Sequence, residues 1–111
     1  MNFDFTEDQK MLRSMVREFA DAEIRPLASK IDSEESIPQG LIKKLAEVGL
    51  LGTAFPEEYG GGGFGEIGFC IAQEEVTRAC GSTAALIGAH QSIGANSILI
   101  GGSEELKMKY L

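Results

Sequence analysis

His90 is the only histidine in the chain, and histidine is the side chain best suited to acid–base chemistry near neutral pH. It lies in a stretch without formal charge between Arg78 and Glu104. Thr83, His90 and Ser97 recur at intervals of seven residues, which places them along one side of a helix. Because the sequence offers His90 neither a nucleophile nor an orienting carboxylate, we favour a hydrogen-bonded structural histidine in a polar seam over a general base.

The adjacent acids Glu74 and Glu75 are a second candidate for proton transfer or metal binding. On a helix, neighbouring side chains point about 100° apart, so these two carboxylates cannot share a proton or a metal ion. We expect either a solvated helix surface here or an ion pair from Glu74 to Arg78 four residues later. No catalytic residue and no metal ligand is therefore assigned.

The run Gly63–Gly68 spells G-x-G-x-x-G, which resembles the fingerprint of a dinucleotide-binding turn. That fingerprint requires a preceding strand and an acidic residue about twenty positions later. No strand is expected before Gly63, and position 88 is a glycine. We interpret the run as a tight loop whose glycines adopt positive φ angles, and we assign no cofactor-binding residue in this chain.

The two cysteines, Cys70 and Cys80, are the remaining reactive side chains. If one continuous helix carries both, they lie about 15 Å apart along its axis, which is too far for a disulfide. Neither belongs to a pattern typical of zinc sites. We expect reduced, buried thiols in a cytoplasmic protein, because the acidic N-terminus lacks the apolar core of a signal peptide.

Length and charge limit the class of protein further. At 111 residues and a hydrophobic fraction of 43%, the chain has the size and composition of one globular domain. Its net charge of −7 and its pI near 4.6 make nucleic acids and anionic membrane surfaces poor partners. The same charge disfavours tight binding of a polyphosphate ligand by this chain alone.

The elements that would position these residues centre on the stretch Glu74–Gly102. Apolar residues leave no purely polar face after Gly81, which predicts a buried central helix that Ser82 caps and that Gly101 and Gly102 end. Its many hydroxyl and amide side chains make a membrane span too costly.

Within this helix, Ala85, Ala89 and Ile93 lie at i, i+4 and i+8 and form one line of small or apolar side chains, called the stripe below. The spacing leaves two uses open. The stripe lets a neighbouring helix pack closely, or it forms one wall of a slot for a long apolar group.

The N-terminal part of the chain also predicts helices. Thr6 and Gln9 form a capping-box pattern at the start of the first helix, and Pro26 should kink or end that helix near Ile24 or Arg25, with a continuation to Ile31. Its inward side is expected to carry Leu12, Met15, Val16, Phe19 and Ile24.

Further helices are expected from Pro38 to Gly49, from Glu66 to Ala79 and from Ser103 onward. Between the first two of these lies an irregular loop, Leu50–Gly65, with three aromatic anchors and a run of four glycines. The last helix still continues at Leu111, so we expect the natural protein to be longer. The inward residues expected from Pro38 to Gly49 are Leu41, Ile42, Leu45 and Val48.

The predicted class is all-α, a bundle of about five helices.

Five segments in order resemble the N-terminal helical domain of the acyl-CoA dehydrogenases over residues 1–111. They are FTEDQKMLRSMVREFADAEIRPLA, LIKKLAEVGLLG, FPEEYGGGG, AQEEVTRACGSTAAL and GGSEELKMKYL. The resemblance implies a larger flavoprotein in which a middle β-domain and a C-terminal helical domain follow this one. It implies FAD as cofactor, an acyl-CoA substrate, an electron-transferring flavoprotein as partner and a homotetramer. The implied reaction is α,β-dehydrogenation of the acyl-CoA thioester to the 2-enoyl-CoA.

The family's catalytic glutamate and most flavin contacts lie in the other domains, so the resemblance assigns no catalytic residue here, and we expect no FAD binding by this chain alone. It does imply that Ala85, Ala89 and Ile93 contribute a wall of the acyl-binding cavity. Bulkier residues at the first two positions shorten that cavity in branched- and short-chain members. The alternative hypothesis is a non-catalytic helical module of the same fold that serves interaction or oligomerisation.

Overall fold

The computed structural model describes residues 1–111 and contains helices and loops but no strand. Short segments join end to end, so that the chain forms five continuous helical stretches, and the predicted all-α class is confirmed. The first stretch comprises α1 (Glu7–Phe19), a π-helical segment (Ala20–Ile24), a 3₁₀ turn (Arg25–Leu27) and α2 (Ala28–Glu34). Next come α3 (Gln39–Glu47) and α4 (Gly65–Ala79). The last two are α5 (Gly81–Gly88) with a second π-helical segment (Ala89–Ala95) and α6 (Asn96–Gly101), and then α7 (Glu104–Tyr110).

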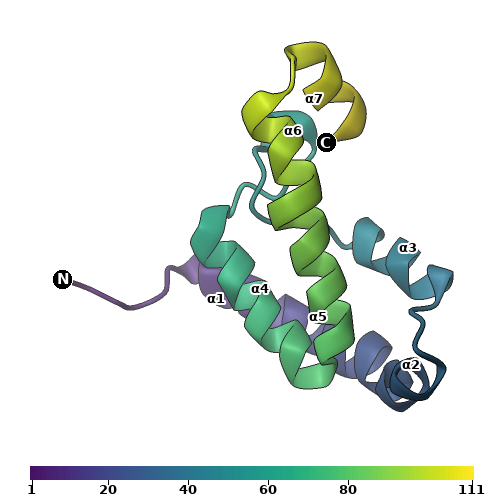
Figure 1. The fold of residues 1–111 in the computed structure, drawn as a ribbon. Helices are drawn as coiled ribbons and strands as arrows, with labels where there is room; N and C mark the ends of the chain where they lie inside the picture. Colours follow the sequence, from purple (N-terminus) through teal and green to yellow (C-terminus); the bar gives the residue numbers. More distant parts are fainter.

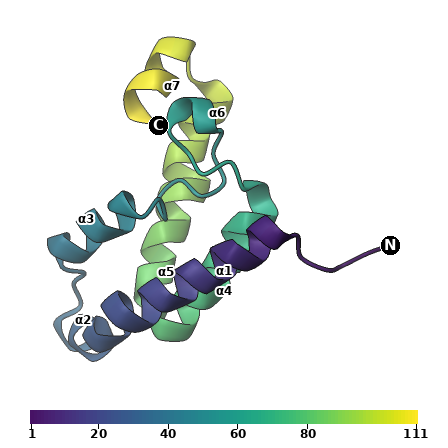
Figure 2. The same ribbon diagram turned by 180° about the vertical axis from the view of Figure 1, so that it is seen from behind.

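The stretch from α5 through α6, called the central helix below, forms the axis of the molecule (Figure 1). α1 packs against α4, and α4 packs against α5. Both views place this pair at the lower half of the central helix, with α3 on its other side and α7 folded back at its upper end (Figures 1 and 2). The upper half of the central helix therefore has fewer neighbours than the lower half.

The first helix begins where the sequence predicts. Thr6 Oγ1 accepts a hydrogen bond from the Gln9 backbone N–H at 3.2 Å, and Gln9 Oε1 accepts one from the Thr6 N–H at 2.9 Å. This reciprocal capping box satisfies two backbone donors that the helix itself leaves free.

Pro26 bends the first helix as predicted. Because proline has no N–H to donate, the regular hydrogen-bond ladder cannot continue through it. The backbone widens just before it, and the Arg25 N–H bonds to the Ala20 carbonyl five residues back. The helix then resumes and runs to Glu34, beyond the predicted end at Ile31, and it stops where Glu35 takes a left-handed conformation with φ of 54°.

The core lies where α1, α3, α4 and α5 meet. Four of the residues predicted to point inward are not part of it: Met15 is 41% exposed, Val48 is 36% exposed, and Phe19 and Ile42 are only partly buried. The buried face of α1 follows Leu12 and Val16, and Met15 is turned about 100° away from Val16. Val48 follows the last residue of α3, where the helical backbone has already ended. The core comprises Leu12, Val16, Ala20, Ile24, Ile31, Leu41, Leu45, Leu50, Ala72, Val76, Ala79, Cys80, Ala84 and Ile87.

The glycine-rich loop between α3 and α4 is closed by backbone hydrogen bonds between its two arms. The Gly62 N–H bonds to the Gly52 carbonyl at 2.9 Å, and the Gly63 N–H bonds to the Phe55 carbonyl at 2.8 Å. Phe55 is buried and anchors the loop, as predicted. A methyl group on Gly61 would overlap the Phe55 carbonyl, so this close approach of the two arms requires glycine there.

The G-x-G-x-x-G run forms a turn that opens α4, and no strand precedes it. Gly63 and Gly65 have φ angles of 71° and 69°, which confirms the interpretation as a tight loop with positive φ. Two boundary predictions are wrong by one or two residues. Pro38 caps α3 instead of lying in its first turn, and Cys80, not Ser82, caps the central helix. Cys80 has extended φ and ψ angles of −162° and 111°, which by itself turns the chain between α4 and α5.

The cysteines form no disulfide. Cys80 is buried, whereas the prediction that Cys70 is buried is wrong, because this residue lies on the exposed side of α4. At the C-terminal end of the chain, Ser103 Oγ accepts a hydrogen bond from the Leu106 N–H at 3.3 Å and caps α7, as predicted.

Candidate functional site

The stripe lies on the uncovered side of the central helix. Ala85, Ala89 and Ile93 are all exposed, and 73% of Ile93 is accessible to solvent. On the opposite side, Ile87 and Gln91 are buried against the rest of the domain. The prediction of a central helix buried all round is therefore wrong for this chain, because no element of the chain covers the stripe.

The π-helical segment aligns the three residues of the stripe. In an α-helix, a step of four residues overshoots a full turn by about 40°, so a stripe at i, i+4 and i+8 slants around the helix. A π turn takes up more residues, and a step of four falls short of a full turn. The α-helical step from Ala85 to Ala89 and the π-helical step from Ala89 to Ile93 thus deviate in opposite directions. The stripe runs more nearly parallel to the helix axis than its spacing predicts.

Sequence reasoning missed Gln91, which lies directly behind the stripe. It is only 2% exposed, its Nε2 donates to the Leu50 carbonyl at 2.7 Å, and its Oε1 accepts from the Ala54 N–H at 3.4 Å. The sequence did contain a sign of this role: Gln91 lies in the stretch without charge. An amide side chain in such a stretch can pair with one donor and one acceptor of buried backbone.

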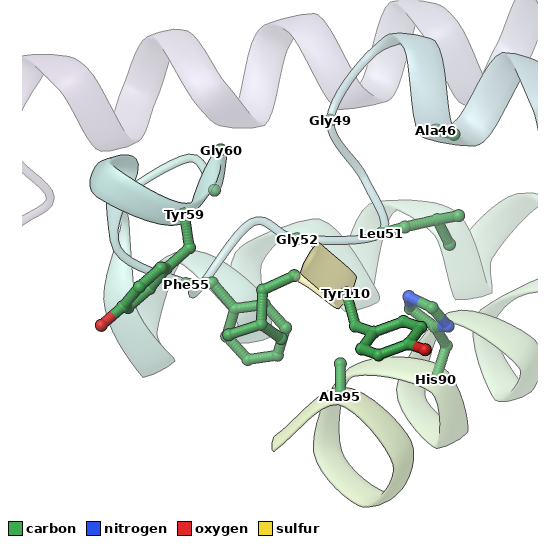
Figure 3. Close-up of a pocket in the computed structure, with 12 residues that line it drawn as sticks. Ala46, Gly49, Leu51, Gly52, Phe55, Tyr59, Gly60, His90, Ala95 and Tyr110 are labelled. Carbon is green, nitrogen blue, oxygen red and sulfur yellow. The ribbon is translucent and has the colours of Figure 1, made fainter. Parts of the chain in front are cut away.

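A cavity of about 190 Å³ lies beside the π-helical segment, between the glycine-rich loop and α7 (Figure 3). The central helix contributes His90 and Ala95 to its lining, and the loop contributes Phe55 and Tyr59. Tyr110 of α7 closes it. No acidic or thiol side chain lines the cavity, so His90 has no partner here that would make it a general base.

The predicted polar seam of Thr83, His90 and Ser97 does not exist. Thr83 is fully buried and its hydroxyl contacts Cys80 Sγ at 3.3 Å, whereas His90 and Ser97 are exposed. The prediction of a hydrogen-bonded structural histidine is also wrong, because the structure gives the His90 side chain no hydrogen bond and places it at the edge of the cavity. A spacing of seven residues drifts by about 20° in a straight helix, which is enough to move His90 past the margin of the buried face.

Of the two adjacent glutamates, Glu74 lies on the solvated helix surface as expected, whereas Glu75 does not. Glu75 is 4% exposed and forms ion pairs with Arg13 at 3.1 Å and Arg78 at 3.4 Å, whereas Glu74 is exposed. The alternative, an ion pair of Glu74 with Arg78, does not form, because Arg78 pairs with Glu75, three residues before it, and with Asp21. Glu75 is thus a structural carboxylate between α1 and α4.

No cluster of three metal-ligating side chains occurs in residues 1–111. None of the helices combines the length and the hydropathy that crossing a bilayer requires.

The chain matches the model of the acyl-CoA dehydrogenase N-terminal domain over residues 6–111. It belongs to the acyl-CoA dehydrogenase family. Among relatives of this family, the chain is 42% identical over its whole length to the short-chain specific acyl-CoA dehydrogenase of Clostridium acetobutylicum, of which it covers 29%.

Solved structures show the same domain. A chain in a structure of the electron transferring flavoprotein of Acidaminococcus fermentans matches with a TM-score of 0.94 and 38% identity, covering 100% of this chain and 29% of that one. Butyryl-CoA dehydrogenase from Megasphaera elsdenii matches with a TM-score of 0.89 and 29% identity, covering 100% and 30%. This acyl-CoA dehydrogenase domain thus spans less than a third of the length of these relatives.

FAD is the cofactor that the family resemblance implies, and the glycine-rich run of this domain does not fit its pyrophosphate. Glu66 lies in the first turn of α4, directly after the run, and the Glu57 side chain lies beside Gly63. Carboxylates at these places repel an anionic ligand, whereas a phosphate-binding turn needs free N–H groups and positive charge.

Proposed function

We propose that the protein carrying this chain is an FAD-dependent acyl-CoA dehydrogenase, which converts an acyl-CoA thioester to the 2-enoyl-CoA. In this proposal, residues 1–111 are its N-terminal helical domain, a middle β-domain and a C-terminal helical domain follow, and this domain supplies no catalytic residue. Its contribution is one wall of the acyl-binding cavity, formed by Ala85, Ala89 and Ile93.

The observation that supports the wall is an apolar stripe without cover in a domain of this family. Ala85, Ala89 and Ile93 present only apolar atoms to solvent, and the π-helical segment lines them up along the helix axis. An exposed apolar strip of this kind is favourable only where another surface covers it. An extended hydrocarbon chain lying along the stripe, with residues from outside this chain on its other side, would remove it from water.

The size of the stripe residues bears on the substrate. Alanine at positions 85 and 89 leaves the space above the helix free. This favours an acyl group of medium or greater length, or a bulky one. The relative from C. acetobutylicum is named short-chain specific, so a series of chain lengths is the informative comparison.

FAD, the electron acceptor and the assembly belong to the proposal for the whole protein. The similarity to a chain in a structure of an electron transferring flavoprotein supports that class of protein as the electron acceptor. A homotetramer follows from the family resemblance. A cytoplasmic location agrees with two free cysteines, one of them exposed.

The test is to produce the natural full-length protein, determine its bound flavin and add butyryl-, octanoyl- or palmitoyl-CoA without oxygen. Bleaching of the flavin absorbance and formation of the enoyl-CoA are the expected results. A protein that contains no flavin and leaves all three thioesters unchanged would contradict the proposal and favour a non-catalytic helical module.

A further inference from the structure

Gln91 connects the central helix to the glycine-rich loop through two hydrogen bonds of one amide group. Its Nε2 donates to the Leu50 carbonyl at 2.7 Å, and the Ala54 N–H donates to its Oε1. The structure gives the Leu50 carbonyl and the Ala54 N–H no other hydrogen bond. Both lie next to buried side chains, Leu50 itself and Phe55. Loss of the amide would therefore leave a partly buried donor and a buried acceptor unsatisfied.

The same residue lies in the π-helical segment. The Gln91 carbonyl accepts the wide hydrogen bond from the Asn96 N–H five residues later. The next residue, Ser92, donates its hydroxyl to the carbonyl of Gly88, one turn earlier in the helix, at 2.5 Å. π-Helical segments are rare and are found most often at functional sites. Here the segment and the side chain that ties it to the loop coincide.

The loop is a firm point of attachment. Its arms are joined from Gly62 to Gly52 and from Phe64 to Thr53, at 2.9 and 3.1 Å. Thr53 is 3% exposed. Movement of Gln91 relative to the loop would break its hydrogen bonds to both Leu50 and Ala54. The loop therefore holds the inward side of the π-helical segment in place.

We propose that Gln91 is a positioning residue for the acyl-binding wall: by tying the π-helical segment to Leu50 and Ala54, it fixes Ala89 and Ile93 in line with Ala85. This inference rests on the proposed function. If the segment relaxed to an α-helix, each step of four residues would add about 40°, and Ile93 would turn about 80° away from Ala85. The Ile93 end of the wall would then lose its alignment while Ala85 stayed in place.

The variant that tests this role is Gln91→Leu, which keeps most of the side-chain volume and removes both hydrogen bonds. Gln73→Leu is its matched control. Gln73 of α4 also fixes the central helix through its amide, since its Nε2 donates to the Ala84 carbonyl at 2.9 Å. That bond holds α5, before the π-helical segment begins.

Hydrogen exchange in the full-length protein measures directly how firmly Gln91 holds the π-helical segment in place. In Gln91→Leu, the amides of residues 89–95 and the Ala54 amide should exchange at least about tenfold faster than in the parent, with little change in α4. Gln73→Leu should not selectively accelerate amide exchange of residues 89–95. Unchanged exchange of residues 89–95 in Gln91→Leu would overturn the proposal, whether or not the protein is an enzyme.

Steady-state kinetics reads the consequence for the substrate. Gln91→Leu should raise KM for palmitoyl-CoA about tenfold and leave kcat/KM for butyryl-CoA within about twofold, because a longer chain covers more of the wall and depends more on its alignment. Gln73→Leu should affect both substrates equally. Equal losses in Gln91→Leu would overturn the positioning role, whereas a parent protein that oxidises no acyl-CoA would overturn the proposed function instead.

Gln91→Glu provides a second variant in case Gln91→Leu does not fold. A carboxylate cannot donate to the Leu50 carbonyl, but a protonated glutamic acid can replace both functions of the amide, and burial favours the protonated form. Exchange of residues 89–95 should be faster than in the parent at pH 8 and should return toward the parent at pH 5. Glu66, which lines a small cavity beside Gln91, and His90 are present in both proteins, so comparison of the variant with the parent at each pH removes their contribution. The same acceleration at both pH values would overturn the proposal.

Discussion

Arg13 of α1 and Glu75 of α4 meet in an ion pair of 3.1 Å between Nε and Oε1, across 62 positions of sequence. Arg78 approaches the other carboxylate oxygen at 3.4 Å and also pairs with Asp21 at 3.2 Å. Partial desolvation works to raise the pKa of Asp21, but hydrogen bonds and charges from Arg25 and Arg78 outweigh it and lower that pKa below its usual value. This chain of charges joins α1 to α4 along the edge of the core.

The first prediction concerns the buried member of this chain. Glu75→Gln should lower the free energy of unfolding by about 2 kcal/mol, because the neutral amide loses the charge that both arginines contact. Urea unfolding followed by circular dichroism measures this. Glu74→Gln is the matched control, and it should change stability by less than about 0.5 kcal/mol because Glu74 is exposed. Equal losses in the two variants would contradict the structural role of Glu75.

The second prediction concerns pH and the Tyr59 hydroxyl, which donates to Glu104 at 2.8 Å and so joins the loop to α7. This hydrogen bond raises the pKa of Tyr59 to about 12, from an ordinary value of 10.0, and it lowers the pKa of Glu104. The folded state therefore holds the tyrosine proton more tightly than the unfolded state. The pKa of Tyr59 in the unfolded chain is 10.0, so the stability that the hydrogen bond contributes is complete below this pH. It is lost as the pH rises toward 12.

Tyr59→Phe should accordingly be less stable than the parent at pH 8, and the difference should shrink as pH is raised above 10. Unfolding in urea at a series of pH values measures the difference. Tyr110→Phe serves as the control at pH 8, because the Tyr110 hydroxyl makes no hydrogen bond in the structure. A difference between parent and Tyr59→Phe that stays constant from pH 8 to 11 would show that the bond to Glu104 does not stabilise the domain.

The third prediction concerns the close approach inside the glycine-rich loop. Gly61→Ala should destabilise the domain by about 1–3 kcal/mol, since the new methyl group would overlap the Phe55 backbone. Gly40→Ala in α3 is the control. Its methyl group would meet no atom within 4 Å, so it should gain about 0.5 kcal/mol from helix propensity. If Gly61→Ala unfolds at the same urea concentration as the parent, the two arms of the loop are not packed as described.

The fourth prediction tests the stripe as part of the acyl-binding cavity in the full-length protein. Ala89→Leu should lower kcat/KM for palmitoyl-CoA at least about tenfold and spare butyryl-CoA, because a leucine excludes several methylene groups from the slot. Ala89→Ser, which hardly changes the volume, should leave the dependence on chain length unaltered. Loss of activity on every substrate together with a lower melting temperature would mean that Ala89 is small to allow helix packing.

The helices could be predicted because local rules determine them. The capping box at Thr6, the bend before Pro26 and the cap at Ser103 depend on residues within one turn of each other. The stripe was also recognisable, since its spacing alone places three side chains on one side of a helix.

The contacts that the sequence did not reveal join residues distant in the chain or depend on irregular backbone. The sequence did not reveal the burial of Glu75, because its partner Arg13 lies on another helix, 62 positions away. Gln91 was missed because its partners are backbone groups of a loop with no regular pattern. The seam through His90 failed because positions near the margin of a buried face become exposed after a small rotation.

The two thiols, one exposed on α4 and one buried at its end, give the domain a built-in pair of labels. Cys70 is open to an alkylating reagent in the native state, whereas Cys80 is covered by the contact of α4 with α5. The rate at which the second thiol is modified therefore reports how often that helix junction opens, with the first as an internal standard of reagent activity. Mass spectrometry of a single wild-type sample could follow both rates, without any introduced probe.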